Sequence, residues 1–155
     1  MVWQAWGLHP DEHSGNRVEK RFDANIAAAL QGGQHSAPER VRKLKAPSHI
    51  ALAQLIVEGS NSFNVIYIDG CHEPASVLCD ACQAWTLLMP GGILIFDDYA
   101  WHLVAQRPKH ACPKPAVDSF LEIYSSHLLV LELNYQCIVQ KLEGADSHQS
   151  TCICR

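Results

Sequence analysis

Two apolar runs that each end abruptly in acidic residues limit the possible folds of this chain more than any other feature. The first run spans 65–68 and stops at Asp69, and the second spans 93–96 and stops at Asp97 and Asp98. Uninterrupted Val, Ile, Leu and Phe residues are typical of strands buried on both faces, which occur in parallel sheets covered by helices. Both strands would then direct their carboxyl ends to the same edge of the sheet, where open α/β proteins bind ligands. The pattern therefore predicts a site that contains all three aspartates.

The size and composition are those of one globular domain. The chain has 155 residues, 48% of them hydrophobic, which is enough for a substantial core. Its net charge of -4 gives no general attraction to nucleic acid or to anionic membranes, and no apolar run approaches the ~20 residues of a membrane span. The first residues lack the features of a secretory signal, and the seven cysteines are odd in number and scattered. We therefore expect a cytoplasmic protein with reduced cysteines and without nucleic-acid or membrane partners.

Helix and strand patterns alternate along the chain. Apolar residues at helical spacing predict helices over 18–30, 48–58, 74–88 and 115–126. Apolar and β-branched runs predict strands over 2–6, 40–45, 63–68, 93–97, 128–133 and 135–142. A loop is expected over 7–16, and Asn134 joins the last two strands as a hairpin. The order predicts an α/β fold, a doubly wound Rossmann-like mixed sheet that closes with an antiparallel C-terminal hairpin.

Three motifs in the second half of this pattern resemble a known family. A strand followed by Asp-Gly-x-His ends at residue 72, a helix ends in Leu-x-Pro-Gly-Gly over 88–92, and a strand followed by Asp-Asp-Tyr ends at residue 99. This combination resembles class I S-adenosylmethionine-dependent methyltransferases, and most closely their small-molecule O-methyltransferase-like branch. The resemblance implies a methyltransferase-like domain over 1–142 and a disordered tail over 143–155.

The chain departs from that family at its N-terminal end. Members begin with a strand and a glycine-rich turn whose backbone approaches the methionine end of the cofactor, a position where a Cβ would interfere. No G-x-G occurs in this sequence, and its glycine pairs at 32–33 and 91–92 follow expected helices. The resemblance therefore implies a domain that is incomplete at the N-terminus and begins near the second strand of the family's sheet.

The acidic strand ends are candidate metal ligands. In metal-dependent members of the similar branch, the positions that match Asp69, Asp97 and Asp98 hold a divalent cation, which lowers the pKa of a substrate hydroxyl. Carboxylate oxygens suit Mg²⁺, so the resemblance implies Mg²⁺ as an additional cofactor. The alternative is that Asp97 or Asp98 only stabilises a turn through its side-chain oxygen.

The resemblance also implies roles for residues around these aspartates. His72 would act as the general base that accepts the hydroxyl proton, because a neutral imidazole titrates near neutral pH. Ser48, Asp69 and Gly70 would contact S-adenosylmethionine, with Gly70 allowing a tight turn beside the ligand. A histidine near a helix start and an N-cap serine need no such role, and both alternatives stay open.

Cys79 and Cys82 form a C-x-x-C pair inside an expected helix. Redox pairs of this kind lie at the start of a helix, and zinc needs four ligands. We expect the two cysteines to share one helical face and to pack as small apolar core residues.

Two functions fit these observations. The first is methyl transfer from S-adenosylmethionine to the hydroxyl of a small-molecule acceptor, assisted by Mg²⁺. The alternative is a truncated, non-catalytic methyltransferase-like chain that acts at most as a binding module. An exposed sheet edge would also allow two copies of the chain to associate.

Overall fold

A computed structural model describes residues 12–31, 41–59 and 63–144 of the chain. The chain divides into two compact units, Met1–Pro47 and Ser48–Arg155. The strand expected over 2–6 and most of the tail over 143–155 lie outside the described residues. Within the described part, no helix combines the length and the apolar character needed to cross a membrane.

The first unit contains one long helix, α1 (Glu12–Gln31). Its start differs from the expected loop over 7–16, because the helix already begins at Glu12. Once a helix is nucleated, each added residue gains a hydrogen bond, so polar residues ahead of the apolar pattern extend it.

The strand expected over 40–45 is absent from its described part, since residues 41–45 have no regular secondary structure. The lysines of this segment instead form ion pairs with α1. Lys43 Nζ lies 2.8 Å from Glu19 Oε1 and 2.8 Å from Asp23 Oδ1, and Lys45 Nζ lies 2.7 Å from Glu19 Oε2. The alternation around Val41 and Leu44 therefore belongs to an irregular segment that is joined to α1 by ion pairs.

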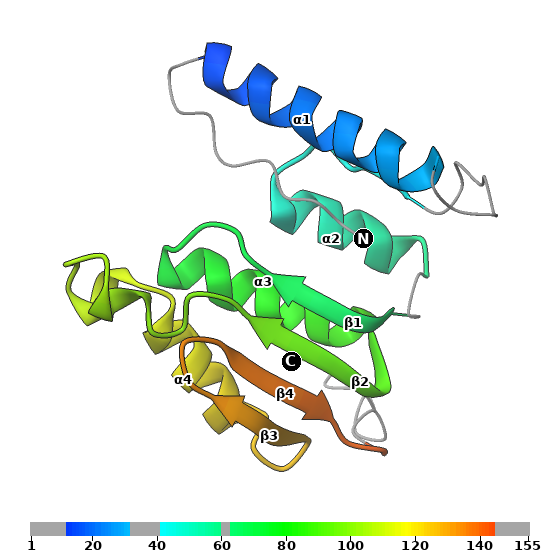
Figure 1. Cartoon of the computed structure of the whole chain (residues 1–155). Helices are drawn as coiled ribbons and strands as arrows, with labels where there is room; N and C mark the ends of the chain where they lie inside the picture. Colours follow the sequence, from blue (N-terminus) through cyan, green and yellow to red (C-terminus); the bar gives the residue numbers. More distant parts are fainter. Residues whose placement is uncertain (1–11, 32–40, 60–62, 145–155) are drawn as a thin grey trace, which may run out of the picture. The chain divides into compact units, whose positions relative to one another are not determined.

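The second unit is built on a four-stranded mixed sheet. Its strands are β1 (Phe63–Ile68), β2 (Leu88–Phe96), β3 (Leu128–Leu133) and β4 (Cys137–Lys141). Their order is β1-β2-β4-β3, with β1 parallel to β2 and the other two pairs antiparallel. The predicted mixed sheet and its C-terminal hairpin are confirmed (Figure 1).

The Pro-Gly-Gly segment interrupts the pairing at the start of β2. Leu88 pairs with Phe63 and Ile93 pairs with Val65, so residues 89–92 bulge out between these two pairs. Gly91 has φ +77°, a conformation that side chains disfavour, and a Cβ on Gly92 would lie only 2.8 Å from a Leu88 side-chain carbon. The strand therefore begins before the predicted position 93, and the bulge near its start requires both glycines.

Three α-helices and two short 3-10 turns complete the described part of this unit. They are α2 (Ser48–Val57), α3 (Pro74–Leu87), η2 (Trp101–Leu103), η3 (Lys109–Ala111) and α4 (Lys114–Ile123). The predictions for α2 and α3 agree with the structure within one residue at either end, whereas α4 ends three residues earlier than expected.

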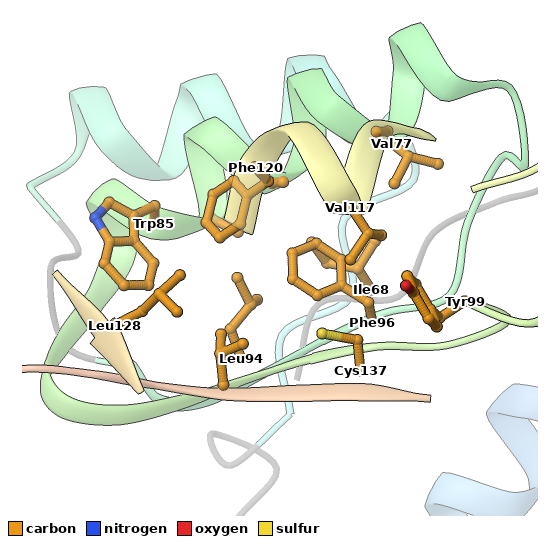
Figure 2. Close-up of a cluster of buried hydrophobic side chains, with 14 of the residues drawn as sticks. Ile68, Val77, Trp85, Leu94, Phe96, Tyr99, Val117, Phe120, Leu128 and Cys137 are labelled. Carbon is orange, nitrogen blue, oxygen red and sulfur yellow. The ribbon is translucent and has the colours of Figure 1, made fainter. Parts of the chain in front are cut away.

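The hydrophobic core lies between the sheet and helices α3 and α4 (Figure 2). Val117 and Phe120, one helical turn apart on α4, are fully buried, as are Leu94 and Phe96, which alternate along β2. The Phe120 ring packs at 5.3 Å from the Phe96 ring and at 5.5 Å from that of Trp85. Because Phe96 directly precedes Asp97, this packing fixes the strand end that carries the acidic pair.

The prediction that Cys79 and Cys82 are core residues is wrong. Both lie on α3 and both are exposed free cysteines. Their spacing does place them on one helical face, but that face points to solvent, while the core is contacted by Val77, Ala81 and Ala84. Cys112 and Cys137 are the buried cysteines among the described residues.

A buried carboxyl group, Asp80, joins α3 to the start of α2. Only 3% of Asp80 is exposed, and its Oδ1 accepts a 2.8 Å hydrogen bond from the Ser48 hydroxyl. Burial raises the pKa of Asp80, although the Ser48 hydrogen bond and His49 act in the opposite direction.

The Asp80→Asn variant should therefore gain stability relative to the wild type as the pH rises. A raised pKa in the folded state means that the wild type loses stability as the pH rises from the unfolded value of about 3.9 through the folded one. An asparagine oxygen can still accept the Ser48 hydrogen bond but does not ionise. Urea unfolding of both proteins between about pH 3.5 and pH 7 measures the difference. If the difference in the free energy of unfolding between the two proteins stayed constant, or moved in favour of the wild type as the pH rises, the raised pKa of Asp80 would be contradicted.

Candidate active site

The acidic residues at the ends of β1 and β2 lie at one edge of the sheet, as the sequence predicts. Ile68 pairs with Phe96 in the parallel ladder, and the Asp97 amide donates a 2.9 Å hydrogen bond to the Ile68 carbonyl. Asp69 and Asp97 therefore begin adjacent loops at the same edge.

A three-residue cluster forms in these loops. Asp69, His72 and Asp98 each offer one ligand atom, and these atoms all lie within 4.8 Å of one another. Asp69 leaves β1, His72 follows three residues later, and Asp98 is the second residue after β2. Carboxylate oxygens and an imidazole nitrogen at this separation can hold a divalent cation or move a proton.

His72 and Asp98 form the closest pair in the cluster. His72 Nε2 lies 2.7 Å from Asp98 Oδ2, and both side chains are only 18% exposed. The imidazole also stacks on the Trp101 indole, with ring centroids 4.1 Å apart and planes inclined by 19°. The imidazole is thus held by a carboxylate at Nε2 and by an aromatic ring against its face.

Asp98 has an unusual backbone conformation that directs its side chain into the cluster. Its φ is +57°, in the left-handed region that non-glycine residues seldom adopt. The Tyr135 hydroxyl donates a 2.6 Å hydrogen bond to Asp98 Oδ1, and the Ala100 amide donates to the Tyr135 carbonyl at 3.0 Å. The hydrogen bond to Asp98 raises the pKa of Tyr135 to about 12, so its hydroxyl remains a donor at neutral pH.

Asp97 is held by different partners and is not part of the three-residue cluster. Gln136 Nε2 donates to Asp97 Oδ1 at 2.8 Å and to the Tyr67 hydroxyl oxygen at 3.0 Å. Burial disfavours the charged form of Asp97, but the hydrogen bonds from Gln136 and Tyr67 outweigh it and lower its pKa. Asp97 is thus a stable anion bound to the hairpin turn.

The electrostatics of the cluster favour a positive charge beside Asp69. Burial, followed by the nearby Asp97 and Asp98 carboxylates, raises the pKa of Asp69, whereas His72 acts in the opposite direction. Carboxylates that repel one another in this way are stabilised by a shared proton or a bound cation.

A pocket lies directly over the cluster. It is lined by Ile68, Asp69, Gly70, Cys71, His72, Val77, Phe96, Asp97, Asp98 and Pro113. Gly70 and the three aspartates of the sequence prediction are thus brought together with His72. Ser48 is not among the lining residues, and its hydroxyl donates a 2.8 Å hydrogen bond to Asp80 Oδ1.

Sequence reasoning missed Trp101, Tyr135 and Gln136. The register of the sheet could have located the last two, because Cys137 at the start of β4 pairs with Phe96 at the end of β2. The two residues before Cys137 must then lie beside the two residues after Phe96, which are the aspartates. Trp101 had no comparable signal in the sequence.

The fold and this edge site define an α/β protein of the Rossmann-like class, with its candidate site at the carboxyl ends of parallel strands. The chain belongs to the methyltransferase domain family, whose model matches residues 4–99, more than half of the sequence. The resemblance to class I S-adenosylmethionine-dependent methyltransferases is thereby confirmed.

Solved structures with the same fold include the MycE methyltransferase from the mycinamycin biosynthetic pathway, in complex with Mg, SAH and mycinamycin VI. It is 16% identical, with a TM-score of 0.53, over 77% of this chain and 36% of MycE. A protein from Corynebacterium glutamicum is 21% identical, with a TM-score of 0.55, over 84% of this chain and 57% of that protein. The chain thus spans less than two thirds of either structure. Comparison by sequence with curated proteins finds no match.

Proposed function

We propose that this chain carries the catalytic edge of an S-adenosylmethionine-dependent methyltransferase that acts on a hydroxyl group of a small-molecule acceptor. The observation that carries the proposal is the His72–Asp98 pair beside Asp69, at the carboxyl ends of two parallel strands. A general base oriented by a carboxylate is what the deprotonation of a hydroxyl requires. The MycE structure, which contains Mg and SAH, supports the choice of cofactors by its similar fold.

His72 would accept the proton of the acceptor hydroxyl as the oxygen attacks the methyl group. The sulfur–carbon bond of S-adenosylmethionine breaks while the oxygen–carbon bond forms, and S-adenosylhomocysteine leaves. Asp98 would hold the imidazole in place and stabilise the imidazolium through the 2.7 Å contact. Asp69 and Gly70, which line the pocket, are the residues that we assign to cofactor contact.

The donor set also fits a divalent cation. Asp69 and Asp98 offer carboxylate oxygens, the ligands that Mg²⁺ and Mn²⁺ prefer. Burial, and after it the nearby Asp97 and Asp98 carboxylates, raise the pKa of Asp69. When bound, such a cation would lower the pKa of a coordinated hydroxyl. Asp97 is engaged by Gln136 and Tyr67, so we assign the cation to Asp69 and Asp98 with His72 adjacent.

Titration calorimetry with S-adenosylhomocysteine, with and without Mn²⁺, tests the proposal. We expect binding with a dissociation constant in the range of about 1 μM to 1 mM that is usual for enzyme substrates. Asp69→Asn should weaken binding, because this carboxylate faces the pocket, whereas Ile123→Ala on the exposed side of α4 serves as a control and should bind as the wild type does.

The second candidate function is a non-catalytic methyltransferase-like chain. The observation that favours it is the absence of any G-x-G among the 155 residues, since such a turn contacts the cofactor in the similar family. The same titration separates the two, because this candidate gives no heat with S-adenosylhomocysteine at millimolar concentration. The cytoplasmic location and the association of copies through a sheet edge stay predictions.

A further inference from the structure

The His72 imidazole needs two restraints to keep one orientation. The 2.7 Å contact between Nε2 and Asp98 Oδ2 fixes the direction of the ring within its plane. A single hydrogen bond still allows the ring to rotate about the line that joins its two atoms. The stack on Trp101, at 4.1 Å and 19°, removes that rotation because it fixes the plane itself.

Trp101 is in turn held by the residue that binds His72. The Trp101 amide donates a 2.9 Å hydrogen bond to the Asp98 carbonyl, so Asp98 anchors the imidazole by its side chain and the indole by its backbone. The Trp101 carbonyl accepts hydrogen bonds from Val104 and Ala105 at 3.0 and 2.9 Å, which close the 3-10 turn η2.

The chain then returns toward the indole. Gln106 has φ +50°, a left-handed conformation that reverses the backbone direction after η2. The Arg107 guanidinium carbon lies 5.5 Å from the centroid of the Trp101 ring, within the range of a cation–π contact. The indole is therefore restrained by the turn η2 and by the Arg107 guanidinium. A ring that only filled space would not require these two restraints.

We propose that Trp101 is a positioning residue, which holds the His72 imidazole in the orientation that faces Asp98. This inference rests on the proposed function, in which His72 accepts a proton. Trp101 stacks on the imidazole, so its effect passes through His72. Loss of one aromatic stack should lower turnover by about three- to tenfold, with the affinity for S-adenosylmethionine unchanged.

The imidazole signals of His72 in the NMR spectrum of the metal-free protein test the inference without any assay of activity. The chain has nine histidines, so the His72 signal is assigned by its loss in His72→Ala. The stacked ring protons of the wild type should be shifted upfield, and the nitrogen shifts should show one tautomer. Trp101→Leu should abolish the upfield shift and give a mixture of tautomers, and Trp101→Phe should restore both features.

Leu103→Ala is the matched control, because Leu103 ends the same turn but is 73% exposed. It should leave the His72 signals as in the wild type. A wild-type His72 signal without an upfield shift overturns the inference even if Trp101→Leu fails to fold, as does a Trp101→Leu protein with unchanged His72 tautomers. If the chain binds no S-adenosylhomocysteine but these NMR results hold, the proposed function fails while the positioning of His72 by Trp101 stands.

Discussion

Replacing Phe120 by alanine should lower the free energy of unfolding by about 3–5 kcal/mol. The Phe120 side chain is fully buried, and its ring contacts the rings of Trp85, Phe96 and Tyr124 at centroid distances of 5.5, 5.3 and 4.5 Å. Its removal leaves a cavity between α4 and the sheet that these large rings cannot close. Because a domain is stable by only about 5–15 kcal/mol, the variant should be close to unfolding at 25 °C. Urea unfolding followed by circular dichroism measures the loss.

Ile123→Ala on the same helix is the control for this variant. Ile123 is 65% exposed, so its truncation should change the free energy of unfolding by no more than about 0.5 kcal/mol. Equal losses for Phe120→Ala and Ile123→Ala would contradict the conclusion that the core packing of Phe120 stabilises the fold, because alanine is the better helix former at both positions. The packing matters for the site because Phe96, one of the rings that Phe120 contacts, directly precedes the acidic pair.

The sequence carried enough information to predict the framework of the site. Apolar runs with no polar interruption define β1 and β2, and their acidic ends mark one edge because parallel strands share a direction. The predictions failed where tertiary contacts determine the local structure or the burial of a residue. Nothing in the i, i+3 spacing of Cys79 and Cys82 says whether their common helical face meets the sheet or the solvent, and the segment around Val41 is held by ion pairs with α1.

For a similar reason, the sequence could not predict which of Asp97 and Asp98 joins the cluster with Asp69. Adjacent residues on a strand point to opposite sides, but the left-handed backbone of Asp98 changes that rule locally. Which carboxylate lies beside Asp69 then depends on the hairpin turn, where Gln136 donates a hydrogen bond to Asp97 and Tyr135 donates one to Asp98. The predicted metal ligands Asp69, Asp97 and Asp98 all lie at this edge, and the cluster of ligand atoms within 4.8 Å of one another contains Asp69, His72 and Asp98.

Asp98→Asn should weaken the binding of Mn²⁺ by at least about 100-fold relative to the wild type, whereas Asp97→Asn should weaken it by no more than about tenfold. The Asp98 carboxylate lies in the cluster with Asp69 and His72, so its replacement removes a ligand and a negative charge. An asparagine oxygen can still accept the Tyr135 hydrogen bond, so the loop should keep its conformation. Electron paramagnetic resonance of free Mn²⁺ during titration gives both affinities directly.

The comparison of the two variants is informative because they remove the same charge from adjacent residues. Long-range electrostatics alone would weaken Mn²⁺ binding about equally in both, since each carboxylate contributes to the raised pKa of Asp69. If Asp98→Asn weakens Mn²⁺ binding much more than Asp97→Asn does, Asp98 must coordinate the cation directly. Equal losses of about 100-fold would instead return Asp97 to the ligand set, which would mean that Gln136 and Tyr67 release it when the cation binds.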